Sequence, residues 1–198
     1  MIKVWDIGVR VFHWSLVATF AIAWLSSDDG SLVHEWSGYV AAGLIAFRLI
    51  WGLVGPRYAR FSQFLTGPGA VKGYLKASLA GREPRYIGHN PAGALMIVAL
   101  LLTMSGTIFT GWLLLEPARV AMLPALPAIV GPAFADDDEE HGDGSVVKDA
   151  HELLANLMLL LVVLHVAGVV VASRRHRENL AAAMISGLKR APGPGDVA

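Results

Sequence analysis

The sequence predicts an all-α integral membrane protein built as one bundle of four transmembrane helices. Hydrophobic residues make up 55% of the 198 residues, and charged residues make up only 16%, whereas soluble domains carry about 25% charge. Four separate runs are long and apolar enough to cross a bilayer, which requires about 20 residues at 1.5 Å of rise each. The alternative, a soluble protein with four buried helices, is disfavoured because a domain of this size could not cover four such runs.

The predicted spans occupy residues 7–26, 34–55, 91–115 and 150–173. Asn90 and Pro91 form a typical helix start, with an N-cap residue followed by proline at the first helical position. Pro56 closes the second span. We interpret residues 1–198 as a single membrane domain without internal repeats.

The N-terminus, Met1–Asp6, lacks a basic region leading to a small-residue cleavage site, so we expect the first span to be retained. Lysine and arginine gather at the N-terminus, between the second and third spans, and in the tail at 174–198. The positive-inside rule therefore predicts a multi-pass protein with both termini in the cytoplasm. The long outer connection at 116–148 is acidic and is interpreted either as a solvated segment or as a docking patch for a basic partner.

Histidine is the residue type that carries chemistry here. The chain has no cysteine, which excludes disulfides, iron–sulfur clusters, Cys-type zinc sites and covalently attached haem. Any haem must therefore be held by histidine or methionine. Ionisable residues within membrane spans are costly and usually functional. Four histidines lie within or at the ends of the spans: His13, His34, His151 and His165.

The spacing of these histidines predicts two pairs. His151 and His165 are 14 residues apart in one span, which places them on the same face and about 21 Å apart along the axis. His34 matches the depth of His151, and His13 matches the depth of His165. Each pair could bind one haem iron from opposite sides, giving two non-covalent haem b groups. A zinc site would need three or four ligands at one depth, and a proton relay would need intramembrane carboxylates that these spans almost lack.

Three further residues are candidates for cofactor binding. Arg48 is a strong charge deep in the second span, and it either pairs with a haem propionate or extends to the membrane surface. Arg10, one turn before His13, is open to the same two interpretations. Gly38, one turn after His34, could make room for a flat ring, although glycine is frequent in membrane helices.

Four stretches of the chain resemble the bacterial cytochrome b561 and nickel–iron hydrogenase cytochrome b-subunit family. They are Val4–Trp14, His34–Gly52, His89–Pro91 and His151–His165, the last with its 14-residue histidine spacing being the most specific. The resemblance implies a four-helix membrane bundle with two b haems, whose ligands would be His13, His34, His151 and His165. It also implies electron transfer between a quinone pool and a partner redox protein.

The leading functional hypothesis is therefore an electron-transfer subunit of a respiratory chain that serves a hydrogenase, another dehydrogenase or a cytochrome c. We expect quinone exchange near Arg48, His89 and Asn90, although His89 and Asn90 could simply begin the third helix. The alternatives are a self-contained superoxide:quinone oxidoreductase and a non-redox scaffold or transporter. No glycine-rich nucleotide motif is present, no nucleic acid is expected as a partner, and the oligomeric state stays open.

Overall fold

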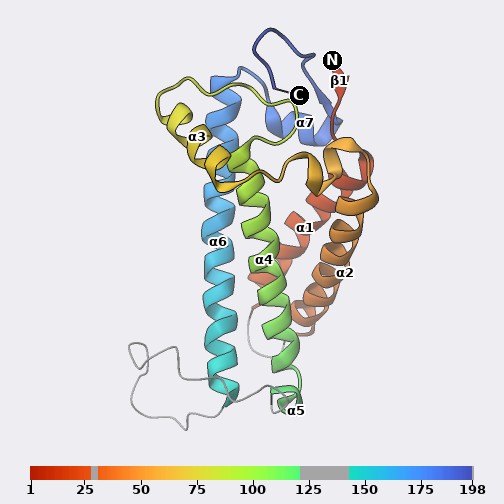
Figure 1. Ribbon diagram of the computed structural model, residues 1–198. Helices are drawn as coiled ribbons and strands as arrows, with labels where there is room; N and C mark the ends of the chain where they lie inside the picture. The colour runs from red at the N-terminus through yellow and green to blue at the C-terminus, as the bar shows by residue number, and fades with distance from the viewer. Residues whose placement is uncertain (28–30, 121–142, 198) are drawn as a thin grey trace.

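The chain folds into a bundle of four long helices capped at one end by short elements (Figure 1). The computed structural model describes residues 1–27, 31–120 and 143–197. The long helices are α1 (Ile7–Leu25), α2 (Leu32–Val54), α4 (Pro91–Leu114) and α6 (Asp143–Arg175). Each is long and apolar enough to cross a membrane. The predicted fold class of an all-α membrane protein with four spanning helices is therefore confirmed.

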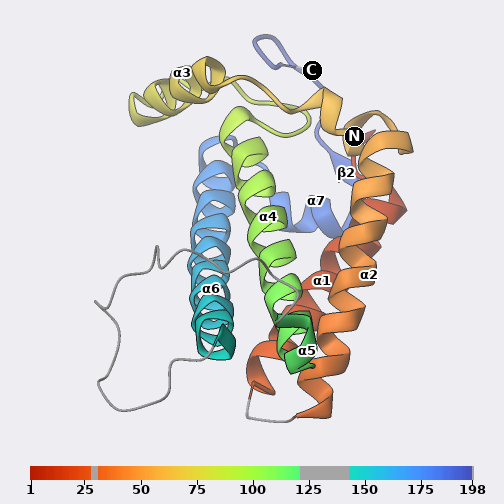
Figure 2. The same ribbon diagram turned by 60° about the horizontal axis from the view of Figure 1, so that its bottom comes forward.

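The shorter elements lie before, between and after the long helices. They are β1 (Ile2–Lys3), η1 (Arg57–Ala59), η2 (Phe61–Gln63), α3 (Pro68–Leu79), α5 (Pro117–Val120), α7 (Leu180–Ser186) and β2 (Leu188–Lys189). Both termini, α3, α7 and the two strands lie at one end of the bundle, which we call the terminal end (Figures 1 and 2). We call the opposite end, where α5 lies, the loop end.

The bounds of α1, α2 and α4 agree closely with the prediction, but α6 begins at Asp143 instead of residue 150. The predicted acidic connection at 116–148 therefore overlaps the helix, because residues 143–148 belong to α6. Val147 is buried and packs against Leu113 near the end of α4, and this apolar contact accounts for the extra turns. Most of the predicted acidic run, at 136–143, lies outside the described residues.

Capping residues begin three of the long helices, and the cap at Asn90 is the one that the sequence predicts. The Asp6 carboxylate accepts a hydrogen bond from the Val9 amide at 3.2 Å, and the Asn90 side chain accepts one from the Gly93 amide at 2.7 Å. The Ser31 hydroxyl likewise accepts one from the His34 amide at 3.4 Å. These caps satisfy amides that have no partner within the helix.

The middle of the bundle is filled by an apolar layer to which all four long helices contribute. Its buried residues are Ala41, Ile45, Met104 and Met158. Leu16 and Phe20 of α1 and Val162 of α6 pack around them. Helix α1 packs along α2, α4 packs along α6, and α2 also contacts α4. Within the described residues, α6 has no comparably close backbone approach to α1 or α2, so side chains must bridge that side of the bundle.

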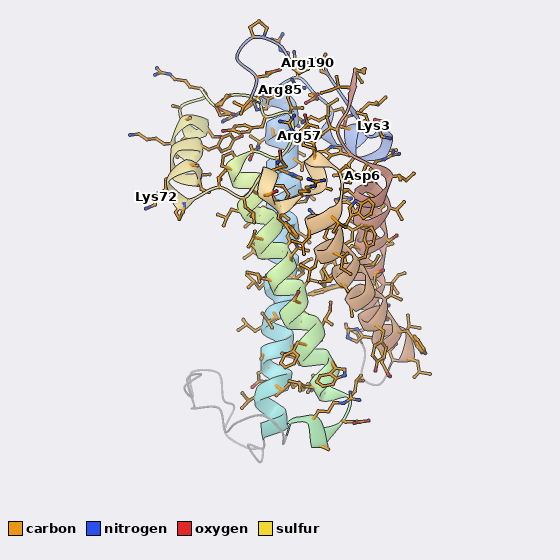
Figure 3. The ribbon with its side chains drawn as sticks, turned by 45° about the vertical axis from the view of Figure 1, so that its right-hand side comes forward. Lys3, Asp6, Arg57, Lys72, Arg85 and Arg190 are labelled. Atoms are coloured by element: carbon orange, nitrogen blue, oxygen red, sulfur yellow. The ribbon has the colours of Figure 1, made fainter. Side chains whose placement is uncertain are left out.

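The tail, predicted only as a cytoplasmic segment, is folded onto the terminal end. Strands β1 and β2 pair antiparallel, with Ile2 opposite Lys189. A small core of Val4, Trp5, Ile87 and Ala183 lies beneath them. Figure 3 shows Lys3, Arg57, Arg85 and Arg190 at this end, with Lys72 on α3 beside it.

An ion network centred on Arg85 holds the tail in place. Arg85 is 4% exposed in its side chain and donates to Glu178 at 2.7 Å and to Asp196. Lys189 donates to the carbonyl of Ile87 at 2.9 Å and lies 3.5 Å from Glu178. Because every charged group in this network has an opposite charge or a carbonyl beside it, the network can be buried without leaving an uncompensated charge.

Candidate functional site

The structure brings the four predicted histidines together as two pairs. The rings of His34 (α2) and His151 (α6) have centroids 6.1 Å apart and form the loop-end pair. The rings of His13 (α1) and His165 (α6) have centroids 6.4 Å apart and form the terminal-end pair. Each pair links α6 to α1 or α2, the two long helices whose backbones α6 does not closely approach.

These separations fit two imidazoles that share one metal ion. A histidine nitrogen binds a first-row metal at about 2 Å, so two opposed nitrogens lie about 4 Å apart and the ring centres about 6 Å apart. The part of the chain that the structure describes contains no group of three or more His, Cys, Asp or Glu residues placed to hold a metal. The four histidines are thus arranged as two separate pairs, and this arrangement suits haem iron better than tetrahedral zinc.

The loop-end pair is oriented by hydrogen bonds to backbone carbonyls. Nδ1 of His34 lies 2.8 Å from the carbonyl oxygen of Ala23, and Nδ1 of His151 lies 3.0 Å from that of Thr107. Because a carbonyl only accepts, each Nδ1 must carry the proton, which leaves Nε2 with a lone pair for a metal. Histidine ligands are usually held in this way by their other nitrogen.

The terminal-end pair has a different environment. Nδ1 of His13 is buried and has no hydrogen-bond partner among the described residues. Oδ2 of Asp6, Nε of Arg10, Nη1 of Arg48 and Nδ1 of His89 are also buried without a partner in that part of the chain. Buried polar atoms are normally hydrogen-bonded. This gathering of unsatisfied atoms therefore suggests a polar ligand at the terminal end.

Arg48 is a buried charge on α2 that packs against η2. It is 4% exposed and shares the buried face of α2 with Ala41 and Ile45. Its guanidinium lies over the Phe61 ring, 4.6 Å from the ring centroid. Arg48 is 14 residues from His34, so it occupies on α2 about the level that His165 occupies on α6. The burial of Arg48 favours the interpretation that it pairs with a haem propionate, which stays a prediction.

Arg10 and Gly38 occupy distinct settings. Arg10 donates from Nη2 to the carbonyl of Ile185, which ties α1 to α7. At Gly38, a Cβ would meet no atom within 4 Å, so there is open space beside His34. Such space is what a flat ring bound to His34 would require.

His89 and Asn90, predicted near a quinone, lie at the start of α4. The His89 ring is packed between Phe64 and Trp5, with centroid distances of 4.5 and 4.6 Å. Burial, together with the charges of Arg48 and Lys189, lowers the pKa of His89 to about 3, so this ring is neutral at physiological pH. The Asn90 side-chain oxygen serves as the helix cap.

Sequence reasoning missed the residues that support His151. The Thr110 hydroxyl lies 3.0 Å from Nδ1 of His151, beside the Thr107 carbonyl. At Gly111, a Cβ would lie 3.0 Å from Cε1 of His151, so glycine allows the ring to lie against α4. The hydroxyl-rich stretch in the third span was a usable signal for the threonines, whereas nothing in the sequence points to the carbonyl of Ala23.

The fold and the paired histidines define a class: a four-helix membrane protein with histidine pairs at two depths. A family model described as prokaryotic cytochrome b561 matches residues 4–187. The chain therefore belongs to the prokaryotic cytochrome b561 family. It is a multi-pass bacterial membrane protein, a b-type cytochrome that functions in electron transfer. No curated protein and no solved structure matched the chain.

Proposed function

We propose that the chain binds two b-type haems, each between two histidines. His34 and His151 would hold one haem, and His13 and His165 would hold the other. The observation that carries this proposal is the pair of ring separations, 6.1 and 6.4 Å, at two levels of one bundle. Open space at Gly38 and the oriented rings of the loop-end pair support the same proposal.

When bound, haem supplies reversible one-electron chemistry. The chain's own residues hold and orient the ligands and keep water out. The carbonyls of Ala23 and Thr107 fix the ring orientation of the loop-end pair. At the terminal end, the N–H groups of Arg48 and Arg10 would complement the acidic groups of a bound haem. The apolar layer around Met104 and Met158 separates the two levels and excludes water between them.

We propose that this arrangement transfers electrons between a partner redox protein and the quinone pool of a respiratory chain. The partner would be a hydrogenase, another dehydrogenase or a cytochrome c. The lysines and arginines at the terminal end favour a cytoplasmic location for both termini in the bacterial inner membrane. The loop-end haem would then lie nearer the periplasm, and the terminal-end haem nearer the cytoplasm.

Quinone exchange is proposed at the terminal end, beside Arg48 and His89. Both side chains have a buried polar nitrogen without a partner among the described residues, and a quinone carbonyl can accept a hydrogen bond from either. Trp5 and Phe64 flank His89 with aromatic surface. Asn90 is assigned to helix capping because its oxygen is engaged by the Gly93 amide.

Haem content tests the first proposal. Purified protein should contain two haems per chain, both low-spin, and acid–acetone should extract both because no cysteine attaches them. One haem per chain, or none, would refute the two-pair scheme.

The quinone site is tested by His89→Ala, with His176→Ala as a control at the same end of the bundle. His89→Ala should lower quinone turnover and alter inhibitor sensitivity while both haems are retained, and His176→Ala should change neither. Unchanged quinone kinetics in His89→Ala would exclude this placement.

A further inference from the structure

A groove lies at the terminal end between the last turns of α6 and the start of α7. Its volume is about 410 Å³, and its walls include Val170, Arg174, Arg177 and Ala181. Helix α7 leaves the end of α6 and runs toward α1 (Figures 1 and 2). The groove is separate from the histidine pairs, which face the interior of the bundle.

The face of α6 that leads into the groove changes from apolar to cationic. Val163, Val166 and Val170 are 58%, 53% and 40% exposed. Their spacing of three and four residues places them in one stripe on the helix, and Arg174 follows in the same stripe. In a membrane this stripe faces lipid, with its cationic end at the level of the headgroups.

The two groove arginines differ from their neighbour Arg175 in their ion pairing within the described residues. Neither Arg174 nor Arg177 forms an ion pair with a residue that the structure describes, whereas Arg175 between them is paired with Glu83 at 2.7 Å. The one carboxylate in the groove wall, Glu178, is already engaged by Arg85 and Lys189. The groove therefore has a net positive charge.

Arg177 also has an unusual backbone conformation. Its φ angle is +49°, and it is the one non-glycine residue with positive φ among the described residues. This left-handed conformation is unfavourable for a side chain larger than glycine. An arginine at a position where glycine would fit better suggests that its charge is useful.

We propose that this groove binds an anionic phospholipid. The phosphate lies between Arg174 and Arg177, and an acyl chain lies along Val170, Val166 and Val163. The chemistry of the groove fits such a lipid. Guanidinium groups bind phosphate oxygens, and the valine stripe provides an apolar surface that runs along α6 away from the arginines. Basic grooves between helices at the membrane surface are known to recognise anionic headgroups.

The first test measures lipid binding to the full-length protein in neutral detergent. Dioleoyl phosphatidylglycerol should bind more tightly than dioleoyl phosphatidylcholine, as measured by native mass spectrometry. Arg174→Gln and Arg177→Gln should each weaken phosphatidylglycerol binding about fivefold, since each basic residue near the surface contributes modestly. Arg190→Gln is the matched control, because the substitution removes the same charge from a residue that does not line the groove, and it should have no effect.

Arg177→Gly separates the lipid role from a structural one. Glycine suits the positive φ, so this variant should fold with equal or higher thermal stability in phosphatidylcholine and still lose phosphatidylglycerol preference. Equal binding by wild type and Arg177→Gly would overturn the proposal, as would an equal loss in Arg190→Gln.

A thiol probe locates the lipid. Because the chain has no cysteine, Ala181→Cys introduces a unique thiol in the groove and Lys72→Cys introduces one on α3. Phosphatidylglycerol should slow maleimide labelling of the first but not of the second, and the protection should disappear when Arg174→Gln and Arg177→Gln are added. Protection by sodium phosphate alone, or equal protection of both thiols, would refute a lipid bound in this groove.

Discussion

The ring of His151 faces that of His34 at 6.1 Å while its Nδ1 lies 3.0 Å from the Thr107 carbonyl. Three helices thus surround the His151 imidazole: α6 carries it, α4 accepts the hydrogen bond from its Nδ1, and α2 carries the neighbouring ring of His34. The terminal-end pair has no equivalent support at Nδ1 of His13 among the described residues. The two sites should therefore differ in how strongly the chain preorganises them.

The pairing predicts that variants fall into two spectral classes. His34→Ala and His151→Ala should each remove the same haem component, and His13→Ala and His165→Ala should each remove the other. The reason is that one imidazole binds haem iron more weakly than two at fixed spacing. Low-temperature absorption spectra of the four purified variants provide the measurement. The scheme fails if His13→Ala and His34→Ala deplete the same component.

Thr110→Val should affect only the loop-end haem. The substitution removes the hydroxyl beside Nδ1 of His151 while keeping the side-chain shape. Loss of such a supporting group typically costs roughly 10-fold in metal affinity or more, and the remaining Thr107 carbonyl should keep the effect near that lower limit. Haem retention during dialysis against apomyoglobin measures it. Thr103→Val, about two turns from Thr110 along α4, is the control and should leave both haems unchanged.

Gly52→Ala should destabilise the terminal end. A Cβ at Gly52 would overlap the Phe61 ring, and this ring also packs on the Arg48 guanidinium. Forcing the ring to move should cost about 1–3 kcal/mol, visible as a lower thermal unfolding temperature. Gly43→Ala on the same helix is the control, since its Cβ meets nothing within 4 Å. It should be neutral or stabilising by up to about 1 kcal/mol.

The tail should loosen in acid. Burial favours a higher pKa for Glu178, but hydrogen bonds from Arg85 and the Arg190 amide outweigh it and lower the pKa below its ordinary value of 4.5. The Gly193 amide and Arg85 likewise hold the pKa of Asp196 below 3.8. Because the pKa of each carboxylate is lower in the folded state, its ionised form stabilises the tail at pH values above its unfolded-state pKa. This stability is lost as the pH falls through the folded-state pKa.

Hydrogen exchange at the Ile87 and Val197 amides, which join the tail to the segment before α4, is the measurement. After correction for intrinsic rates, protection should be constant at neutral pH and fall below about pH 4.5. Glu178→Gln should lower protection at neutral pH and flatten the acid response. A wild-type profile that is flat down to pH 3 would contradict the assignment.

Topology follows from the charges at the terminal end. A periplasm-active reporter fused after residue 198 should be inactive, because the lysines and arginines at this end favour the cytoplasmic side. The same reporter placed within residues 121–142 should be active. Activity of the C-terminal fusion would reverse the orientation.

The sequence alone determined the four spans, the cap at Asn90, and the two depths of histidines. These are local properties: the bilayer demands about 20 apolar residues, and helix rise converts a 14-residue spacing into a depth. Only the tertiary structure decided that Arg48 is buried over Phe61 and that Thr110 and Gly111 support His151. It also decided that α6 begins at Asp143 and that the tail folds back on β1. Each of these depends on contacts between segments far apart in the chain, whose rotation and approach are set by packing and not by any local pattern.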